Sequence, residues 1–228
     1  MDDGVITLFT IPYLDIPITN VILMSWITMA VIIFVAWIST RKMKTIPTGL
    51  QNVAEVVVEY VNNFCVKNIG SLGLKYAPYV GTVALFLAIS NTAGALFMGE
   101  LTGGVIGPST RCMAIPVTLA IMTMIVVIIA GIKEKGILGF FKGLFKPNPI
   151  LFPFNVLEFF IKPLSLSMRL FGNILGAYIL MEMLIQNLPY ILPGVACIYF
   201  DLFDGLLQVY VFALLTTLYI GGEVSEEE

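Results

Sequence analysis

One basic residue lies in the middle of an otherwise apolar segment. Arg169 falls within residues 155–187; the preceding basic residue is Lys162, and none follows. A guanidinium group stays charged in proteins, and placing that charge at the depth of a bilayer costs several kcal/mol. Charged side chains in membrane segments usually serve function, so Arg169 is the first candidate. The alternative is an arginine that reaches the interface or pairs internally for structure alone.

The neighbours of Arg169 at helical spacing are small or polar. At about 100° per residue, Ser165, Gly172, Asn173 and Gly176 share its face of a helix. Glycines on such a face let another helix approach closely. The spacing therefore predicts that Arg169 faces a tightly packed partner rather than lipid.

The last apolar segment carries a second polar group. Asp201, Asp204, Gly205 and Gln208 follow the spacing i, i+3, i+4, i+7 and share one helix face. Two carboxylates in an apolar helix are costly unless they are hydrated or paired.

Two more polar residues, Tyr178 and Glu182, lie one turn apart in the preceding segment, roughly opposite Arg169. If the two segments form an antiparallel hairpin, the polar groups line an aqueous cleft that could relay protons or small cations. The alternative places Asp201 and Glu182 at the outer membrane surface as ordinary solvated residues.

The composition limits the possible functions. The chain has 228 residues, of which 58% are hydrophobic and 12% charged, whereas soluble domains are about half apolar and a quarter charged. It has no histidine, no phosphate-binding motif and no basic patch. The three cysteines, Cys65, Cys112 and Cys197, lack metal spacing and are expected to be buried small hydrophobic residues. We therefore expect no cofactor, no metal and no nucleic acid.

The hydropathy pattern predicts an all-α, polytopic protein forming a single membrane domain with about five crossings. Three spans are expected at 21–40, 77–98 and 112–132, and a long, tilted helix hairpin at 155–222. Within the second span, Asn91 is expected to make a hydrogen bond between helices.

The other segments are expected at the membrane surfaces. Residues 1–20 are acidic and turn-rich, and residues 47–70 form an amphipathic helix too polar to span. Residues 136–153, broken by glycines and prolines, are interpreted as interfacial or re-entrant. The acidic residues from Glu223 to the end are expected to form a solvated tail.

The positive charges predict the orientation. Arg41, Lys42 and Lys44 directly follow the first span, which places the N-terminus outside and, after five crossings, the C-terminus in the cytoplasm. All lysines and arginines except Arg111 and Arg169 then fall on the cytoplasmic side.

Two sequence runs resemble subunit a of the rotary F-type ATP synthases. The first is P-L-S-L-S-M-R-L-F-G-N at 163–173, and the second is L-Q-V-Y-V-F at 207–212, continuing through 215–219. The likeness is close over the C-terminal third and holds in layout elsewhere. It implies a non-catalytic stator subunit beside a rotating ring of c subunits, with peripheral-stalk b subunits and the remaining synthase subunits as further partners.

The resemblance also implies residue roles. Arg169 matches the essential arginine that faces the ring's carboxylate, forces it to release its ion and blocks leakage between two offset half-channels. Asn173 and Gln208 match polar positions near that arginine, and Ser165 matches a serine one turn earlier.

Two positions depart from the common bacterial pattern. Asp201 stands where many bacterial members have histidine, and Tyr178 stands where they have glutamate. In those members the two positions serve the outer half-channel together. Here a carboxylate remains at one of the two positions, on the last helix.

Two other classes of protein are alternatives. A stand-alone secondary transporter or channel would use Arg169, Asp201 and Asp204, but the internal repeat typical of many transporters is not visible. A membrane-embedded enzyme would need a nucleophile–base pair or a metal set that the sequence does not offer. A bacterial plasma membrane is the expected location, and the choice between H⁺ and Na⁺ stays open because the ring would hold the ion.

Overall fold

The computed structural model describes residues 7–11, 16–41, 43–47, 49–96, 112–144, 152–187, 199, 203 and 205–224. Over these residues the fold is helical apart from a short hairpin of β1 (Thr7–Ile11) and β2 (Ile16–Thr19). The helices are α1 (Asn20–Thr40), α2 (Leu50–Ile69), α3 (Gly73–Leu96), α4 (Ala114–Leu144), α5 (Phe152–Asn187) and α7 (Gly205–Val224). The predicted all-α fold is confirmed, and the hairpin is an addition that the sequence did not suggest.

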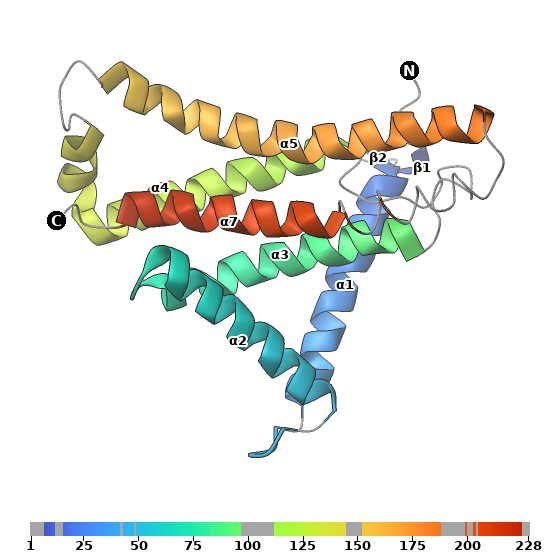
Figure 1. Ribbon diagram of the computed structural model, residues 1–228, viewed down its shortest axis with the longest axis horizontal. Coiled ribbons are helices and arrows are strands. Elements are labelled where there is room, and N and C mark those ends of the chain that lie inside the picture. Colours follow the sequence, from blue (N-terminus) through green and yellow to red (C-terminus); the bar gives the residue numbers. More distant parts are fainter. Residues whose placement is uncertain are drawn as a thin grey trace.

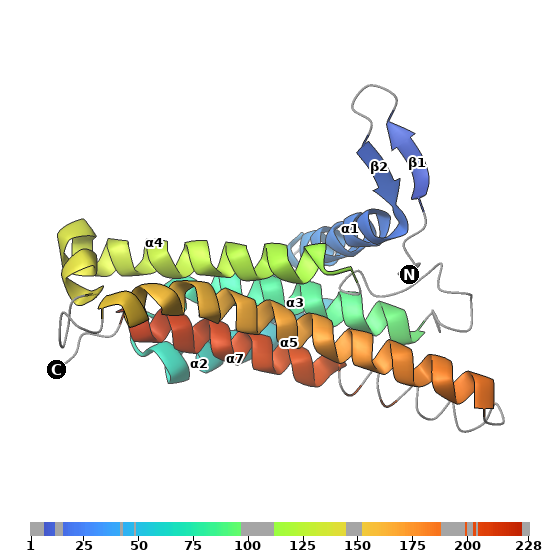
Figure 2. The ribbon, with the colours of Figure 1, turned by 90° about the horizontal axis from the view of Figure 1, so that it is seen from above.

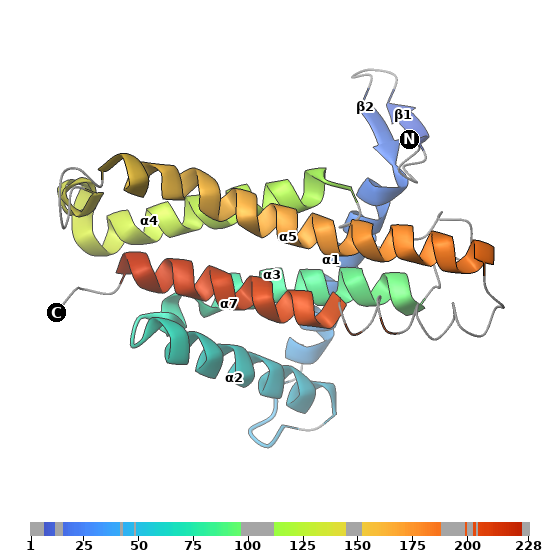
Figure 3. The same ribbon diagram turned by 45° about the horizontal axis from the view of Figure 1, so that its top comes forward.

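Four helices form an elongated bundle. α3, α4, α5 and α7 run side by side, while α1 crosses the bundle steeply and α2 packs against α3 and α7 (Figures 1 and 3). The β-hairpin projects beyond the N-terminal end of α1 (Figure 2). α7 contacts α2, α3, α4 and α5, so it is the central helix of the bundle.

The protein is a multi-pass membrane protein. In the described part of the chain, four helices are long and apolar enough to cross a membrane: Asn20–Thr40, Gly73–Thr92, Ala114–Phe140 and Gly205–Val224. Each of these segments is apolar and 20 to 27 residues long, and a bilayer requires about twenty apolar residues for one crossing. The fifth predicted crossing, by α5, stays a prediction.

Glycines mark the ends of the amphipathic helix α2. Gly49 and Gly70 have φ angles of 64° and 89°, a region that side-chain-bearing residues rarely adopt. The Gly70 N–H donates to the Val66 carbonyl at 2.9 Å, which satisfies one of the last carbonyls of the helix. A glycine with a positive φ thus stands at each end of α2.

The predicted break at Gly136 is present, with a φ of 74°. Residues 137–144 nevertheless continue as helix, and residues 145–151 lie outside the described part. After the break the chain folds back, and a Cβ built on Gly131 would lie 2.9 Å from the Phe140 ring. Glycine at 131 is what permits this close contact.

Two apolar clusters hold the bundle together. One joins α2, α3, α4 and α7 around Cys65, Val127 and Ile220. The other joins α3, α4, α5 and α7, and contains Val83, Leu87, Ala120, Leu166 and Phe212.

The expectation that the cysteines are buried is confirmed for Cys65. Cys65 is fully buried, and burial raises the pKa of its thiol. Cys112 is half-buried, and Cys197 lies outside the described residues.

Candidate functional site

The inner side of α5 fixes the direction in which Arg169 points. Leu166 is 1% exposed and packs in the second cluster against residues of α3, α4 and α7. Ser167 is also buried, and its Oγ donates to the Leu164 carbonyl at 3.0 Å. Leu166 and Ser167 therefore mark the side of α5 that packs into the bundle, and Arg169, three residues after Leu166, lies on the exposed flank of that side, about 60° away around the helix.

The exposed side of α5 carries the residues that the sequence grouped around Arg169. Ser165, Arg169, Gly172 and Gly176 are all exposed. A Cβ built on Gly172 or Gly176 would meet nothing within 4 Å. Packing within the described chain therefore does not require these glycines, and the glycine-lined face is displayed outward.

Apolar side chains surround this face. α5 lies at the edge of the bundle (Figure 1), and large apolar side chains are exposed along most of its described length. The exposed set includes Leu164, Met168, Leu175, Ile179, Leu180 and Met183. Apolar side chains of this kind suit contact with lipid or with another protein better than contact with water.

The side chains of five candidate residues lie outside the described part of the structure. Asn173, Tyr178 and Glu182 lie in α5, but nothing is described of their side chains. Asp201 and Asp204 lie outside the described residues. The predicted aqueous cleft between the two long segments therefore stays a prediction, although α5 and α7 do run antiparallel and in contact (Figures 1 and 2).

The glutamine of the last helix lies on the inner side of α7. Gln208 is 2% exposed, and with Phe212 and Thr216 it forms a row of buried residues at intervals of four. The structure thus places Gln208 inside the bundle and Arg169 on its outer surface.

The amide in α3 makes the kind of contact that the sequence predicted. Asn91 Nδ2 donates to the Gly205 carbonyl at 3.2 Å and joins α3 to the start of α7. A Cβ built on Gly205 would lie 3.1 Å from Asn91 Cβ, so the two helices meet closely here. The predicted hydrogen bond between helices is confirmed.

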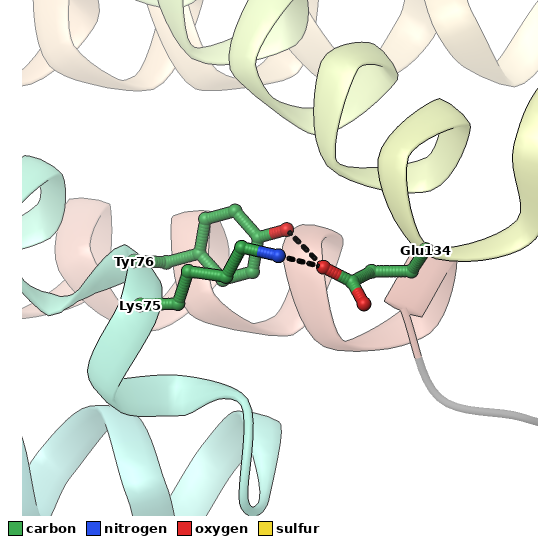
Figure 4. A network of polar contacts seen from close by, with 3 residues as sticks. All are labelled: Lys75, Tyr76 and Glu134. Carbon is green, nitrogen blue, oxygen red and sulfur yellow. Dashed lines mark hydrogen bonds and ion pairs between the residues drawn. The ribbon is translucent and has the colours of Figure 1, made fainter.

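Ion pairs tie the helices together at the other end of the bundle. Lys75 of α3 pairs with Glu134 of α4, and the Tyr76 hydroxyl donates to the same carboxylate at 3.3 Å (Figure 4). Lys162 of α5 pairs with Glu158 at 3.0 Å and with Glu223 of α7 at 3.8 Å.

The interpretation of Glu223 as part of a solvated tail is wrong. It lies in the last turn of α7, its side chain is 22% exposed, and it pairs with Lys162. The sequence signalled the local pair, because Glu158 and Lys162 stand four residues apart. It gave no sign of the distant one.

No group of three or more histidine, cysteine or acidic residues that could hold a metal ion occurs among the described residues. The polar groups that the structure does describe are an exposed guanidinium, hydroxyls, amides and ion pairs. Such groups can orient and stabilise charges, and this set contains no assembled nucleophile and base.

The fold and the site define a polytopic helical membrane protein that displays an arginine on a glycine-lined helix face. Residues 22–221 match the model of the family described as ATP synthase A chain. Because the match spans most of the chain, the protein belongs to this family. The resemblance noted in the sequence is therefore confirmed, and the chain is a membrane-sector subunit of ATP synthase.

Proposed function

We propose that the chain is the ion-translocating stator subunit and that α5 packs against a rotating ring of c subunits. The observation that carries this proposal is the exposed face of α5. Arg169 lies there beside two glycines, Gly172 and Gly176, that no neighbour within the described chain requires. A flat strip of small residues lets the helix of a partner approach closely enough to bring its carboxylate to Arg169.

The proposed mechanism is electrostatic. At a separation of about 4 Å and an effective dielectric constant of about 20, two opposite unit charges attract by roughly 4 kcal/mol. That energy corresponds to a fall of about three units in the pKa of the ring's carboxylate. The carboxylate passing Arg169 thus gives up its ion, and the fixed positive charge repels any cation that would cross directly between the half-channels.

The remaining polar residues are proposed to line the ion path. Asp201, Asp204, Tyr178 and Glu182 would form the outer half-channel. Their candidate status rests on the resemblance and on their spacing, together with the antiparallel contact of α5 and α7.

Polar groups closer to Arg169 would assist the transfer. Ser165 lies one turn before it on the same exposed face. Asn173 follows one turn later, and Gln208 supplies a buried amide from α7. Hydroxyl and amide groups can bind water and pass a proton or cation along without carrying charge themselves.

The proposed location is a bacterial plasma membrane, with the N-terminus outside and the C-terminus in the cytoplasm. The distribution of lysine and arginine supports this orientation. Proposed partners besides the c ring are the peripheral-stalk b subunits and the remaining synthase subunits. Lipid would cover the apolar surfaces that no subunit contacts.

The test compares ATP-driven ion uptake into inverted membrane vesicles between the wild type and Arg169→Ala, at equal amounts of assembled complex. A pH-sensitive dye and radioactive sodium report the ion. We expect uptake to disappear in Arg169→Ala. Arg41→Ala is the control, because Arg41 is an exposed arginine at the end of α1, stacked on Trp37, and it should pump normally.

Uptake near the wild-type rate in Arg169→Ala would contradict the stator mechanism. Copurification with a ring of small, apolar subunits separates the proposal from the alternative of a stand-alone transporter. A transporter would be isolated without such a ring and would move its substrate in the absence of ATP hydrolysis.

A further inference from the structure

The position of α5 relative to α7 depends on a limited set of contacts. α5 packs mainly against α4 and touches α7 less extensively. Leu166 contributes to the shared apolar cluster with Phe212 of α7. A second connection between these helices lies about one turn before Leu166, at Lys162.

The ammonium group of Lys162 sits between the two helices. Its Nζ lies 3.8 Å from Oε1 of Glu223 on α7 and 3.0 Å from Oε2 of Glu158 on α5. It also lies 5.6 Å from the ring centroid of Tyr219 and 5.8 Å from that of Phe159. The ammonium group is thus close enough to be attracted by one carboxylate and one aromatic ring on each of the two helices.

The two carboxylates differ in their surroundings. The side chains of Lys162 and Glu223 are each 22% exposed, whereas that of Glu158 is 59% exposed. A solvated pair within one helix contributes little. A partly buried pair between helices is more sensitive to geometry, and its best-attested role is to specify an arrangement.

The α7 side of this connection is itself held in place. A Cβ built on Gly131 of α4 would lie 3.6 Å from Glu223 Cβ, so α4 and α7 are in close contact there. On the α5 side, Phe140 of α4 packs beside Phe159 of α5, with ring centroids 5.9 Å apart. Glu223 therefore offers α5 a fixed point of attachment.

Helix geometry links this attachment to Arg169. Seven residues separate Lys162 from Arg169, which places the two side chains about 20° apart around the helix and about 10 Å apart along it. A rotation of α5 that carries Lys162 away from Glu223 carries Arg169 through the same angle. Pro163 removes one backbone hydrogen bond from this turn, so the helix needs support here.

We propose that Lys162 is a positioning residue that clamps α5 to α7 through Glu223 and thereby sets the direction of Arg169. This inference rests on the proposed function, because it assigns Lys162 a role in the transfer that Arg169 performs. Lys162 itself contacts no transported ion.

The first test measures the two helices directly. Spin labels are placed at Leu164 of α5 and Leu218 of α7, both exposed, in the assembled complex with the native cysteines replaced by serine. We expect Glu223→Gln to broaden or shift the distance distribution. Glu158→Gln is the matched control, because it removes the other carboxylate from Lys162 without touching α7, and it should leave the distribution unchanged.

The second test measures ions transported per ATP hydrolysed. Lys162→Met keeps the length of the side chain and removes its charge, whereas Lys162→Arg keeps the charge. We expect several-fold weaker coupling in Lys162→Met and in Glu223→Gln, and near-normal coupling in Lys162→Arg and Glu158→Gln. A purely structural role would lower the amount of assembled complex and leave the coupling ratio unchanged.

Equal behaviour of Glu223→Gln and Glu158→Gln would overturn the proposal, as would equal coupling in Lys162→Met and Lys162→Arg. Altered label distances with normal coupling would also overturn it, because the clamp would then not position Arg169. Failure of the proposed function is recognised separately, by normal pumping in Arg169→Ala, and it leaves the label distances intact.

Discussion

The two long C-terminal helices use their polar residues in opposite ways. α7 turns Gln208, Thr216 and Thr217 inward, where all three are at most 2% exposed. α5 turns Ser165 and Arg169 outward. These three polar groups of α7 therefore belong to the interior of the chain, whereas Ser165 and Arg169 of α5 belong to its surface.

The glycines of the two helices show the same contrast. A Cβ built on Gly221 of α7 would lie 3.1 Å from the Asn68 carbonyl oxygen of α2, and one built on Gly205 would crowd Asn91. Gly172 and Gly176 of α5 face open space. Gly205 and Gly221 of α7 thus serve packing within the chain, whereas Gly172 and Gly176 of α5 leave a surface that another helix can approach.

The largest effect on stability is expected on the inner side of α5. Leu166→Ala leaves a cavity in the cluster of four helices and should lower the free energy of unfolding by about 2–5 kcal/mol. The measurement is unfolding of the purified complex in mixed micelles. Leu164→Ala, on the exposed side two residues earlier, should change it by no more than about 0.5 kcal/mol. Equal losses would mean that α5 has no distinct inner side.

The next effect contrasts the two kinds of glycine. Gly221→Ala forces a methyl group toward the backbone of α2 and should destabilise the chain by about 1–3 kcal/mol. Gly172→Ala adds its methyl group in open space, and alanine favours helix by up to about 1 kcal/mol. It should therefore leave the chain as stable or more stable in the same unfolding assay. A loss of stability in Gly172→Ala would remove the contrast.

A larger side chain on the α5 face should affect function rather than folding. Gly172→Leu is expected to lower coupled ion uptake about tenfold, equivalent to roughly 1.4 kcal/mol, because it holds the partner helix away from Arg169. The amount of inserted chain should stay normal on immunoblots of membranes. Gly222→Leu is the control, since Gly222 of α7 is also exposed with open space around it. Equal loss of uptake in both variants would refute a special role for the α5 face.

The smallest effect is expected at the contact between α3 and α7. Asn91→Ala removes the hydrogen bond to the Gly205 carbonyl and should lower the free energy of unfolding by about 1 kcal/mol. Thr118→Ala removes a bond to the carbonyl of its own helix at an exposed site and should be close to neutral. If Asn91→Ala is also neutral, that hydrogen bond does not help to hold α7 in place.

The sequence was sufficient for features that depend on local periodicity. Apolar runs located the helices, glycine marked the break at 136, and helical spacing placed Ser165, Arg169 and Gly172 on one face. These features follow from residues within a few turns of one another, and one chain contains that information.

Contacts between distant segments were beyond that reasoning. Glu223 belongs by composition to an acidic C-terminal run, and its pairing with Lys162 depends on how α5 and α7 pack. The inward position of Gln208 likewise depends on neighbours from other helices. The β1–β2 hairpin was missed because that segment was interpreted from its acidic and turn-forming residues alone.

The central claim is that the exposed face of α5 meets the ring, and thiol cross-linking tests it most directly. Single cysteines are introduced at Ser165 and Gly172 of α5, and at the exposed Leu218 of α7, in a chain whose native cysteines are serine. A second cysteine is placed in the ring helix near its carboxylate. We expect the two α5 positions to form cross-links to the ring subunit and position 218 to form none. Cross-linking from 218 alone, with both α5 positions unreactive, would contradict it.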